Sequence, residues 1–367
     1  MVMSLASLIA TGTKVWLDGV EPSDIKTQRV WGITGATSNP TIVSKILGQG
    51  LFDARIGDLI EQGVTDDRIA WILGDELVTQ AQRAFLAVWE ETKGNDGYVS
   101  FELDPLIEED AGLSHGDRVR RYVELGKEWS AGHKNRMIKV PATRAGLDAL
   151  EPLAAVGVTI NVTLMFTERQ YRVARDAIWR GARRREDGLD NFKSVYSIFV
   201  SRVDAYTEAH VPELSRAAQG MAGIVNAKRI WRENMGFWRD KGLRLHQEIV
   251  FASTGVKRPA DPPDKYAEAF AGSDIETNPT ATNTAIETSP KAYASRVEQM
   301  PPASILDEID RKVDMAAMER RLMDEGTKKF ADAQRATLSL IAQKRADRRR
   351  GDRRTERAID DHSRKET

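Results

Sequence analysis

The sequence predicts an α/β protein built as a (β/α)8 barrel with additional C-terminal helices. Short β-like segments alternate with longer helical segments along most of the 367 residues. The β-like segments are continuous apolar or β-branched runs, such as Val-Tyr-Ser-Ile-Phe-Val, which is typical of parallel strands buried on both faces. Hydrophobic residues make up 41% of the chain, enough to build a core of this size. A doubly wound open sheet is the structural alternative.

Eight segments read as strands, which is the number that a barrel of this kind requires. The eighth has the weakest apolar character, so the count depends most on it. The predicted strands are residues 14–17, 30–34, 98–102, 136–140, 158–162, 194–200, 248–252 and 274–277.

The segments between the strands carry helical periodicity and helix-capping residues. Apolar residues from Ile69 to Val88 recur at i, i+3 and i+4 spacing, with Thr65 as a candidate cap and Gly94 just beyond the end. Thr167 and Gln170 form the pattern of a capping box that opens another helix. Three parts are therefore expected: a catalytic barrel over residues 1–300, helices packed on it over 301–343, and a charged, flexible tail over 344–367.

The tail differs in charge from the rest of the protein. Residues 344–357 contain eight basic and three acidic residues, although the net charge of the whole chain is only −1. We interpret this segment as a solubilising tail in preference to an RNA- or polyphosphate-binding arm, because one short tail on an acidic body creates little oriented field. Nucleic acid is therefore not an expected partner.

Composition excludes several classes of site. Cysteine is absent, which rules out disulfide scaffolds, thiol catalysis, iron–sulfur clusters and cysteine-bound zinc. The five histidines show no helical metal-ligand spacing, so no metal is expected. No apolar run approaches the ~18 residues of a membrane span, and no targeting segment is evident, so we expect a cytoplasmic protein. The sequence leaves open whether the protein forms a homo-oligomer.

Polar residues at the C-terminal ends of the predicted strands are the candidates for chemistry, since barrel active sites lie there. Lys139 stands between two apolar residues in a strand that ends at Pro141. Burial favours the uncharged amine, a nucleophile that forms a Schiff base with a carbonyl, although a lysine at a strand end can also extend into solvent. The other candidates at these ends are Asp18, Asn39, Glu102, Asn161, Thr163, Ser197, Arg202 and Ser253.

Two carboxylates, Asp18 and Glu102, would provide the acid and base steps that a Schiff-base aldolase needs, unless they serve as helix caps or structural ion pairs. The neutral side chains suit a polyol. Arg202 and Lys257 are candidates for binding a phosphate, and Arg202 has structural pairing with Asp204 as its alternative.

A set of motifs in this chain resembles the transaldolase family, in that family's order and over roughly residues 14–344. The motifs Thr-Ser-Asn-Pro and Ile-Lys-Val-Pro-Ala-Thr together are specific for this family, whereas either motif alone would be moderately specific. The matching segments are Lys-Val-Trp-Leu-Asp at 14–18, Gly-Ala-Thr-Ser-Asn-Pro-Thr-Ile at 35–42, Ile-Lys-Val-Pro-Ala-Thr at 138–143, Asn-Val-Thr at 161–163, Ser-Ile-Phe-Val-Ser-Arg at 197–202, Ala-Ser-Thr at 252–254 and Glu-Gly-Thr-Lys-Lys-Phe-Ala at 325–331.

The resemblance implies a barrel enzyme that moves a dihydroxyacetone unit from sedoheptulose 7-phosphate or fructose 6-phosphate to an aldose phosphate, with no metal or organic cofactor. It implies that Lys139 forms the Schiff base, that Glu102 acts through a water held with Thr163, and that Asp18 takes the C4 hydroxyl proton. It further implies that Asn39, Asn161 and Ser197 hold the dihydroxyacetone hydroxyls, and that Arg202 holds the phosphate.

The seventh strand departs from the family pattern. Many relatives have Ala-Ser-Phe-Arg there, with a second phosphate-binding arginine, whereas this chain has Ala-Ser-Thr-Gly-Val-Lys at 252–257. Ser253 carries over, and Lys257 is the candidate replacement for the arginine. Two other functions remain open: a related aldolase that releases free dihydroxyacetone, and an inactive barrel used for binding.

Overall fold

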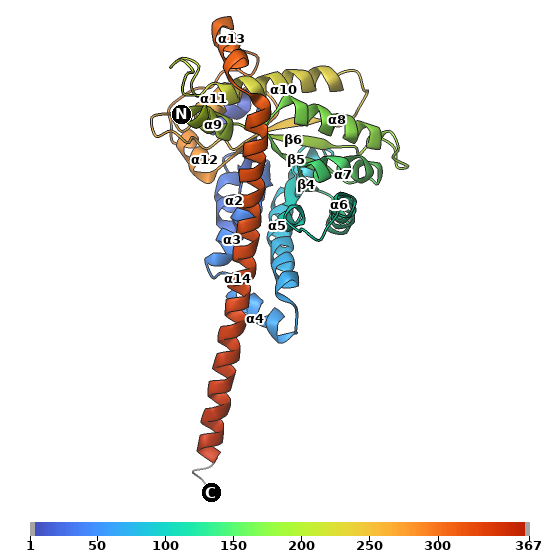
Figure 1. Cartoon of the computed structure of the whole chain (residues 1–367), viewed down its shortest axis with the longest axis vertical. Helices are drawn as coiled ribbons and strands as arrows, with labels where there is room; N and C mark the ends of the chain where they lie inside the picture. Colours follow the sequence, from blue (N-terminus) through green and yellow to red (C-terminus); the bar gives the residue numbers. More distant parts are fainter. Residues whose placement is uncertain (1–3, 364–367) are drawn as a thin grey trace.

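The computed structural model describes residues 4–363, with side chains through residue 350, and contains a closed barrel of parallel strands (Figure 1). The strands follow one another around the barrel in chain order, and β1 pairs with β8. This closure confirms the (β/α)8 prediction and excludes the open sheet. The strands are β1 (Lys14–Asp18), β2 (Gly35–Thr37), β3 (Val99–Glu102), β4 (Arg136–Pro141), β5 (Ile160–Met165), β6 (Ser194–Phe199), β7 (Glu248–Ala252) and β8 (Ile275–Asn278).

Helices connect the strands and cover the outside of the barrel. Thr65 caps α5 as predicted, and Thr167 caps α8, although Gln170 accepts the Phe166 N–H and not that of the capping residue. The helices are α1 (Ser4–Ala10), α2 (Pro22–Arg29), α3 (Pro40–Gly48), α4 (Asp53–Glu61), α5 (Asp66–Glu91), the 3-10 helix η1 (Pro105–Glu108), α6 (His115–Ser130), α7 (Arg144–Ala155), α8 (Glu168–Ala182), α9 (Ser201–His210), α10 (Ala222–Trp238), α11 (Lys265–Phe270), α12 (Thr280–Glu287), α13 (Ala303–Lys312) and α14 (Met315–Ser363).

The second strand lies further along the chain than the sequence predicts, so the prediction over residues 30–34 is wrong. Val30 caps the end of α2 and is 78% exposed, and Gly32 turns the chain with φ +94°. The strand is instead the short run that begins at Gly35. A Cβ atom at Gly35 would lie 2.6 Å from the indole of Trp16, so the bulk of Trp16 requires glycine at this point of the barrel.

Inside the barrel an apolar layer separates two polar ends. The strand period of two places Lys14, Trp16 and Asp18 of β1 on the same, inward face. Trp16 packs in one cluster with inward residues of four other strands: Met137, Val195, Val250 and Ile275. This layer therefore divides the polar groups inside the barrel into two clusters, one at each end.

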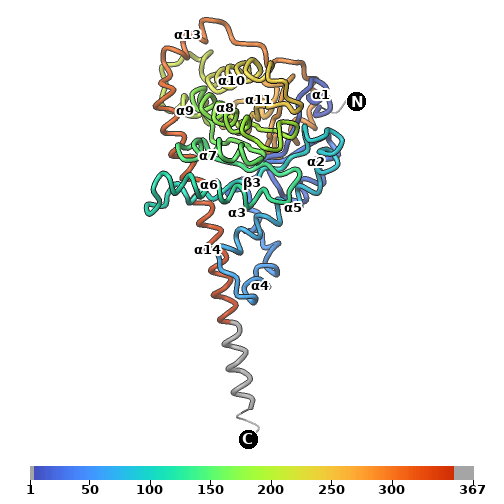
Figure 2. The backbone as a smooth tube through the Cα atoms, turned by 90° about the vertical axis from the view of Figure 1, so that its right-hand side faces the viewer, coloured from blue at the N-terminus to red at the C-terminus, as the bar shows by residue number. Residues whose placement is uncertain are grey.

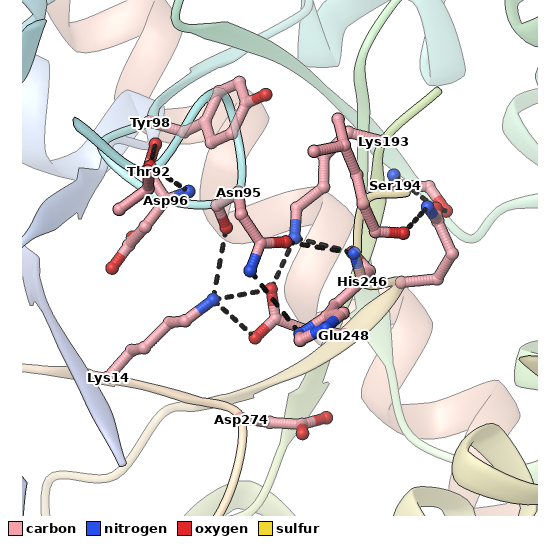
Figure 3. A network of polar contacts seen from close by, with 12 residues as sticks. Lys14, Thr92, Asn95, Asp96, Tyr98, Lys193, Ser194, His246, Glu248 and Asp274 are labelled. Atoms are coloured by element: carbon pink, nitrogen blue, oxygen red, sulfur yellow. Dashed lines mark hydrogen bonds and ion pairs between the residues drawn. The ribbon is translucent and has the colours of Figure 1, made fainter. Parts of the chain in front are cut away.

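The N-terminal end holds a closed network of charges (Figure 3). Lys14 Nζ lies 2.8 Å from Glu248 Oε1 and donates to the Asn95 carbonyl at 3.1 Å. Lys193 forms an ion pair with the same Glu248 and donates to the His246 carbonyl at 2.6 Å. Glu248 therefore has two ammonium partners, and each ammonium also has a backbone acceptor.

The C-terminal helix α14 runs past α9 and α3 toward α4 (Figures 1 and 2). It continues without a break across residue 343, where the sequence places the start of the charged tail. Lys344 and Arg345 lie 2.7 Å from carboxylates at Asp53 and Asp66 of α4 and α5, and these ion pairs hold the start of the predicted tail against the body. The remaining side chains of that tail, from residue 351, lie outside the described residues. In the described part of the chain no helix has an apolar stretch long enough to cross a membrane.

Candidate active site

A cavity of about 580 Å³ opens at the C-terminal ends of the strands. Charged and hydroxyl side chains from several strands line it, together with one face of α14. Asp18, Lys139 and Ser197 contribute from β1, β4 and β6, and the other sequence candidates that line it are Asn39, Arg202, Ser253 and Lys257. The barrel thus brings together residues that lie up to 239 positions apart in the chain (Asp18 to Lys257).

Lys139 lies on β4, and only 4% of its surface is exposed. Its Nζ donates to the Ser38 carbonyl at 3.0 Å and lies 3.2 Å from the Glu102 carboxylate. The strand register places Glu102, Lys139 and Asn161 side by side on three adjacent strands. Lys139 is therefore held in the barrel interior and does not extend into solvent.

Glu102 is buried beside Lys139 and is the most strongly perturbed acid of this site. Burial raises the pKa of Glu102 to about 7, against the opposing attraction of the Lys139 ammonium. Glu102 Oε2 is the oxygen that lies 3.2 Å from Lys139 Nζ and forms no hydrogen bond to any other described group, and the buried Thr163 Oγ1 has no hydrogen-bond partner among the described residues. Glu102 and Thr163 stand behind the wall of the main cavity and not on its lining. An acid with a pKa near 7 can both donate and accept a proton at physiological pH.

Asp18 is the second carboxylate of the site. Burial raises its pKa, and the Lys139 ammonium and a hydrogen bond from the Thr37 hydroxyl at 3.2 Å oppose the rise. Thr37 also lies 2.8 Å from the Thr277 hydroxyl, which orients it toward Asp18. Asp18 caps no helix and forms no ion pair within the described residues, so neither structural alternative for it applies.

A line of neutral hydrogen bonds crosses the base of the site. Ser197 Oγ donates to Asn161 Oδ1 at 2.7 Å, and Asn161 Nδ2 donates to Ser100 Oγ at 2.8 Å. These bonds fix the orientation of the Asn161 amide. Asn39 caps α3, and its side-chain oxygen accepts the Ile42 N–H at 3.0 Å, which leaves its NH2 group to face the cavity.

The cationic side of the cavity includes Arg202 at the start of α9 and Lys257 in the loop after β7. The guanidinium of Arg202 lies over the ring of Phe199, 5.3 Å from its centre. The alternative pairing of Arg202 with Asp204 is excluded, because Asp204 points away and accepts the Gly223 N–H and the Tyr266 hydroxyl. Ser253 lines the cavity in the left-handed region, with φ +54°, and its hydroxyl lies 3.0 Å from that of Ser201.

Sequence reasoning identified no individual residue of α14 as part of this site. Leu322, Glu325, Lys329 and Phe330 line the cavity from that helix, which the sequence placed on the outside of the barrel. The segment at 325–331 was noticed only as a point of resemblance. The helical spacing of these four residues on one face was the signal that could have identified them.

Comparison with known proteins shows which family the chain is similar to. A family model described as transaldolase/fructose-6-phosphate aldolase matches residues 15–341. The chain is 30% identical over 345 residues to a transaldolase of Neisseria meningitidis serogroup C, covering 90% of this chain and 97% of the relative. It is 32% identical over 304 residues to transaldolase 2 of Streptomyces avermitilis, covering 77% and 80%. It is 30% identical over 354 residues to a transaldolase of Mycobacterium tuberculosis, covering 89% and 93%.

Proposed function

The chain belongs to the transaldolase/fructose-6-phosphate aldolase family, and we propose that it is a transaldolase that works through a Schiff base on Lys139. The observation that carries the proposal is the buried Lys139 amine, 3.2 Å from a carboxylate whose pKa is about 7. A lysine so placed can lose its proton to Glu102 and attack a ketose carbonyl.

Imine formation needs a proton donor as well as a base. The Lys139 amine adds to C2 of the ketose phosphate and gives a carbinolamine. Glu102, now protonated, returns its proton to the departing hydroxyl, so that water leaves and the iminium forms. We assign this transfer to Glu102 through a water held with Thr163, because the buried Thr163 hydroxyl has no hydrogen-bond partner in the described part of the chain and Glu102 Oε2 has only the Lys139 ammonium, at 3.2 Å.

Carbon–carbon cleavage is assigned to Asp18. Its carboxylate removes the proton of the C4 hydroxyl, the C3–C4 bond breaks, and the bonding electrons move into the iminium to give an enamine. The shortened aldose phosphate then leaves. An acceptor aldose phosphate reacts in reverse, with Asp18 returning the proton and water releasing the product from Lys139. Asn39, Asn161 and Ser197 would hold the dihydroxyacetone hydroxyls, and Arg202 and Lys257 the phosphate.

The enamine must persist until the acceptor binds, and apolar cover over the site favours this. Leu322 and Phe330 of α14 supply such cover, since both are buried and line the cavity. Protection of this kind favours transfer over release of free dihydroxyacetone, which is the activity of the aldolase alternative.

Borohydride trapping tests the proposal. The protein is reduced in the presence of fructose 6-phosphate, and its peptides are analysed by mass spectrometry. We expect a dihydroxyacetone adduct on the peptide that holds Lys139, and none in the folded Lys139→Met variant. A second incubation with erythrose 4-phosphate separates transferase from aldolase, because a transferase consumes the donor only when the acceptor is present. Absence of an adduct on any lysine would leave the inactive, binding barrel as the remaining function.

A further inference from the structure

Three cationic side chains from separate parts of the chain converge on one side of the cavity. Arg202 comes from α9, Lys257 from the loop after β7, and Lys329 from α14. In the part of the chain with described side chains, no carboxylate lies within 4.0 Å of any of the three. Glu325, the acidic residue that α14 contributes to the lining, forms its ion pair with Arg321 at 2.9 Å and also attracts the Arg202 guanidinium from a greater distance.

The three cations affect one another. Partial burial lowers the pKa of Lys329, and the positive charge of Arg202 lowers it further. Burial and then the charges of Arg202 and Lys329 lower the pKa of Lys257. The carboxylates of Asp18 and Glu325, which line the same cavity, offset these three charges only in part, and the remaining positive charge attracts an anion to this side of the cavity.

The close packing of α14 against the barrel explains how Lys329 reaches this position. A Cβ atom at Gly326 would lie 2.9 Å from a methyl group of Leu164 and 3.5 Å from the Arg202 guanidinium, so glycine lets the helix come this close without displacing the Leu164 side chain. Leu164 itself adopts a left-handed conformation, with φ +52°, beside Thr163. Lys329 lies three residues after Gly326, hence on the same helical face.

We propose that Lys329 is a substrate-binding residue that holds the phosphate of the sugar together with Arg202 and Lys257, and that it makes this site select phosphorylated over unphosphorylated ketoses. The inference rests on the proposed function. A phosphate dianion would neutralise two of the three positive charges, and α14 would then be part of the substrate site and not only a cover. Lys139 and the three cations line the same cavity, so one sugar phosphate can reach both.

The test compares two ketones that form the same adduct on Lys139. Dihydroxyacetone has no phosphate, whereas fructose 6-phosphate has one, and the rate of borohydride-trapped adduct formation is measured for each at subsaturating concentration. In Lys329→Met we expect the rate with fructose 6-phosphate to fall about 10-fold to 100-fold, the scale of a lost charge-assisted hydrogen bond, and the rate with dihydroxyacetone to change less than about 2-fold. Lys329→Arg should restore most of the loss.

Lys328→Met is the matched control, because Lys328 is the neighbouring residue, is exposed and lies 2.6 Å from Asp332. It should leave both rates unchanged. Equal losses with the two ketones in Lys329→Met would show a structural role and overturn the proposal, as would an unchanged rate with fructose 6-phosphate. If the unmodified protein formed no adduct with either ketone, the Schiff-base function itself would fail, which is a separate result.

Discussion

Each end of the barrel holds a buried lysine paired with a buried glutamate: Lys139 with Glu102 at the C-terminal end, and Lys193 with Glu248 at the N-terminal end. Burial alone would raise the pKa of Glu248, but the ammonium groups of Lys193 and Lys14 outweigh it and lower the pKa. At the other end Lys139 is the single ammonium partner of Glu102, and burial prevails. The same two residue types therefore lower the pKa of the glutamate at one end and leave it raised at the other.

The two pairs differ in the number of polar groups that contact them. At the N-terminal end every charged atom of the pair has a partner, including backbone carbonyls (Figure 3). At the C-terminal end, Glu102 Oε2 has only the Lys139 ammonium, at 3.2 Å, and the buried Thr163 hydroxyl has no partner among the described residues. Unpartnered buried polar groups cost stability, so an end that keeps them is one where a substrate or a water completes the set.

The largest expected effect is the difference in transfer activity between substitutions of the two lysines. Lys139→Met should reduce transfer by more than about 10⁴-fold, the scale of losing an essential catalytic group. Its free energy of unfolding at pH 6 should stay within about 1 kcal/mol of the parent, because Glu102 can become neutral by taking a proton. Lys193→Met should retain transfer but lose about 3 kcal/mol of stability, since Glu248 stays charged and loses one of its partners.

Urea unfolding followed by circular dichroism and an assay of transfer measure both quantities in the same two variants. A folded Lys193→Met protein without transfer would contradict the separation of the two ends, and so would a Lys139→Met protein that remains active.

The two glutamates should respond to pH in opposite directions. The pKa of Glu102 is raised, so its contribution to stability is present at low pH and is lost as the pH rises from about 4.5 through about 7. The pKa of Glu248 is lowered, so its contribution is present above about 4.5 and is lost as the pH falls. Glu102→Gln should therefore become more stable than the parent as pH rises toward 8, by up to about 3 kcal/mol.

Activity should follow the same titration of Glu102. At low pH Glu102 is protonated and cannot act as the base for imine formation, so kcat/KM should rise through about pH 7. Glu102→Gln should be about 100-fold less active and should lack this rise. A variant that kept the same pH profile would show that another group titrates, and Glu248→Gln serves as the comparison, with the profile expected to stay intact.

Sequence patterns predicted the elements that depend on neighbouring residues in the chain. Apolar runs indicate the long buried strands, and capping residues indicate where helices begin. The ends of the predicted strands then indicate which polar residues lie close together. The position of the second strand is not predicted correctly, because the strand begins at a glycine. Gly35 is required there by the bulk of Trp16 on the neighbouring strand, a contact that the local sequence does not reveal. The role of Lys329 was missed because it depends on where α14 docks, and that is set by tertiary contacts such as Gly326 against Leu164.

The smallest expected effect concerns single hydroxyl groups at the two ends. Ser194 Oγ, near Lys193, donates to Gln247 at 2.7 Å, so Ser194→Ala should cost about 1 kcal/mol of stability and leave transfer unchanged. Thr163→Val keeps the side-chain shape and removes a buried hydroxyl that has no partner in the described chain, so stability should rise by up to about 1 kcal/mol. Imine formation, measured by borohydride trapping, should nevertheless slow about 10-fold, because the water beside Glu102 loses its second holder. If Thr163→Val lowered stability as Ser194→Ala does, the hydroxyl would be a structural bond donor, and the two ends of the barrel would not differ in the way described above.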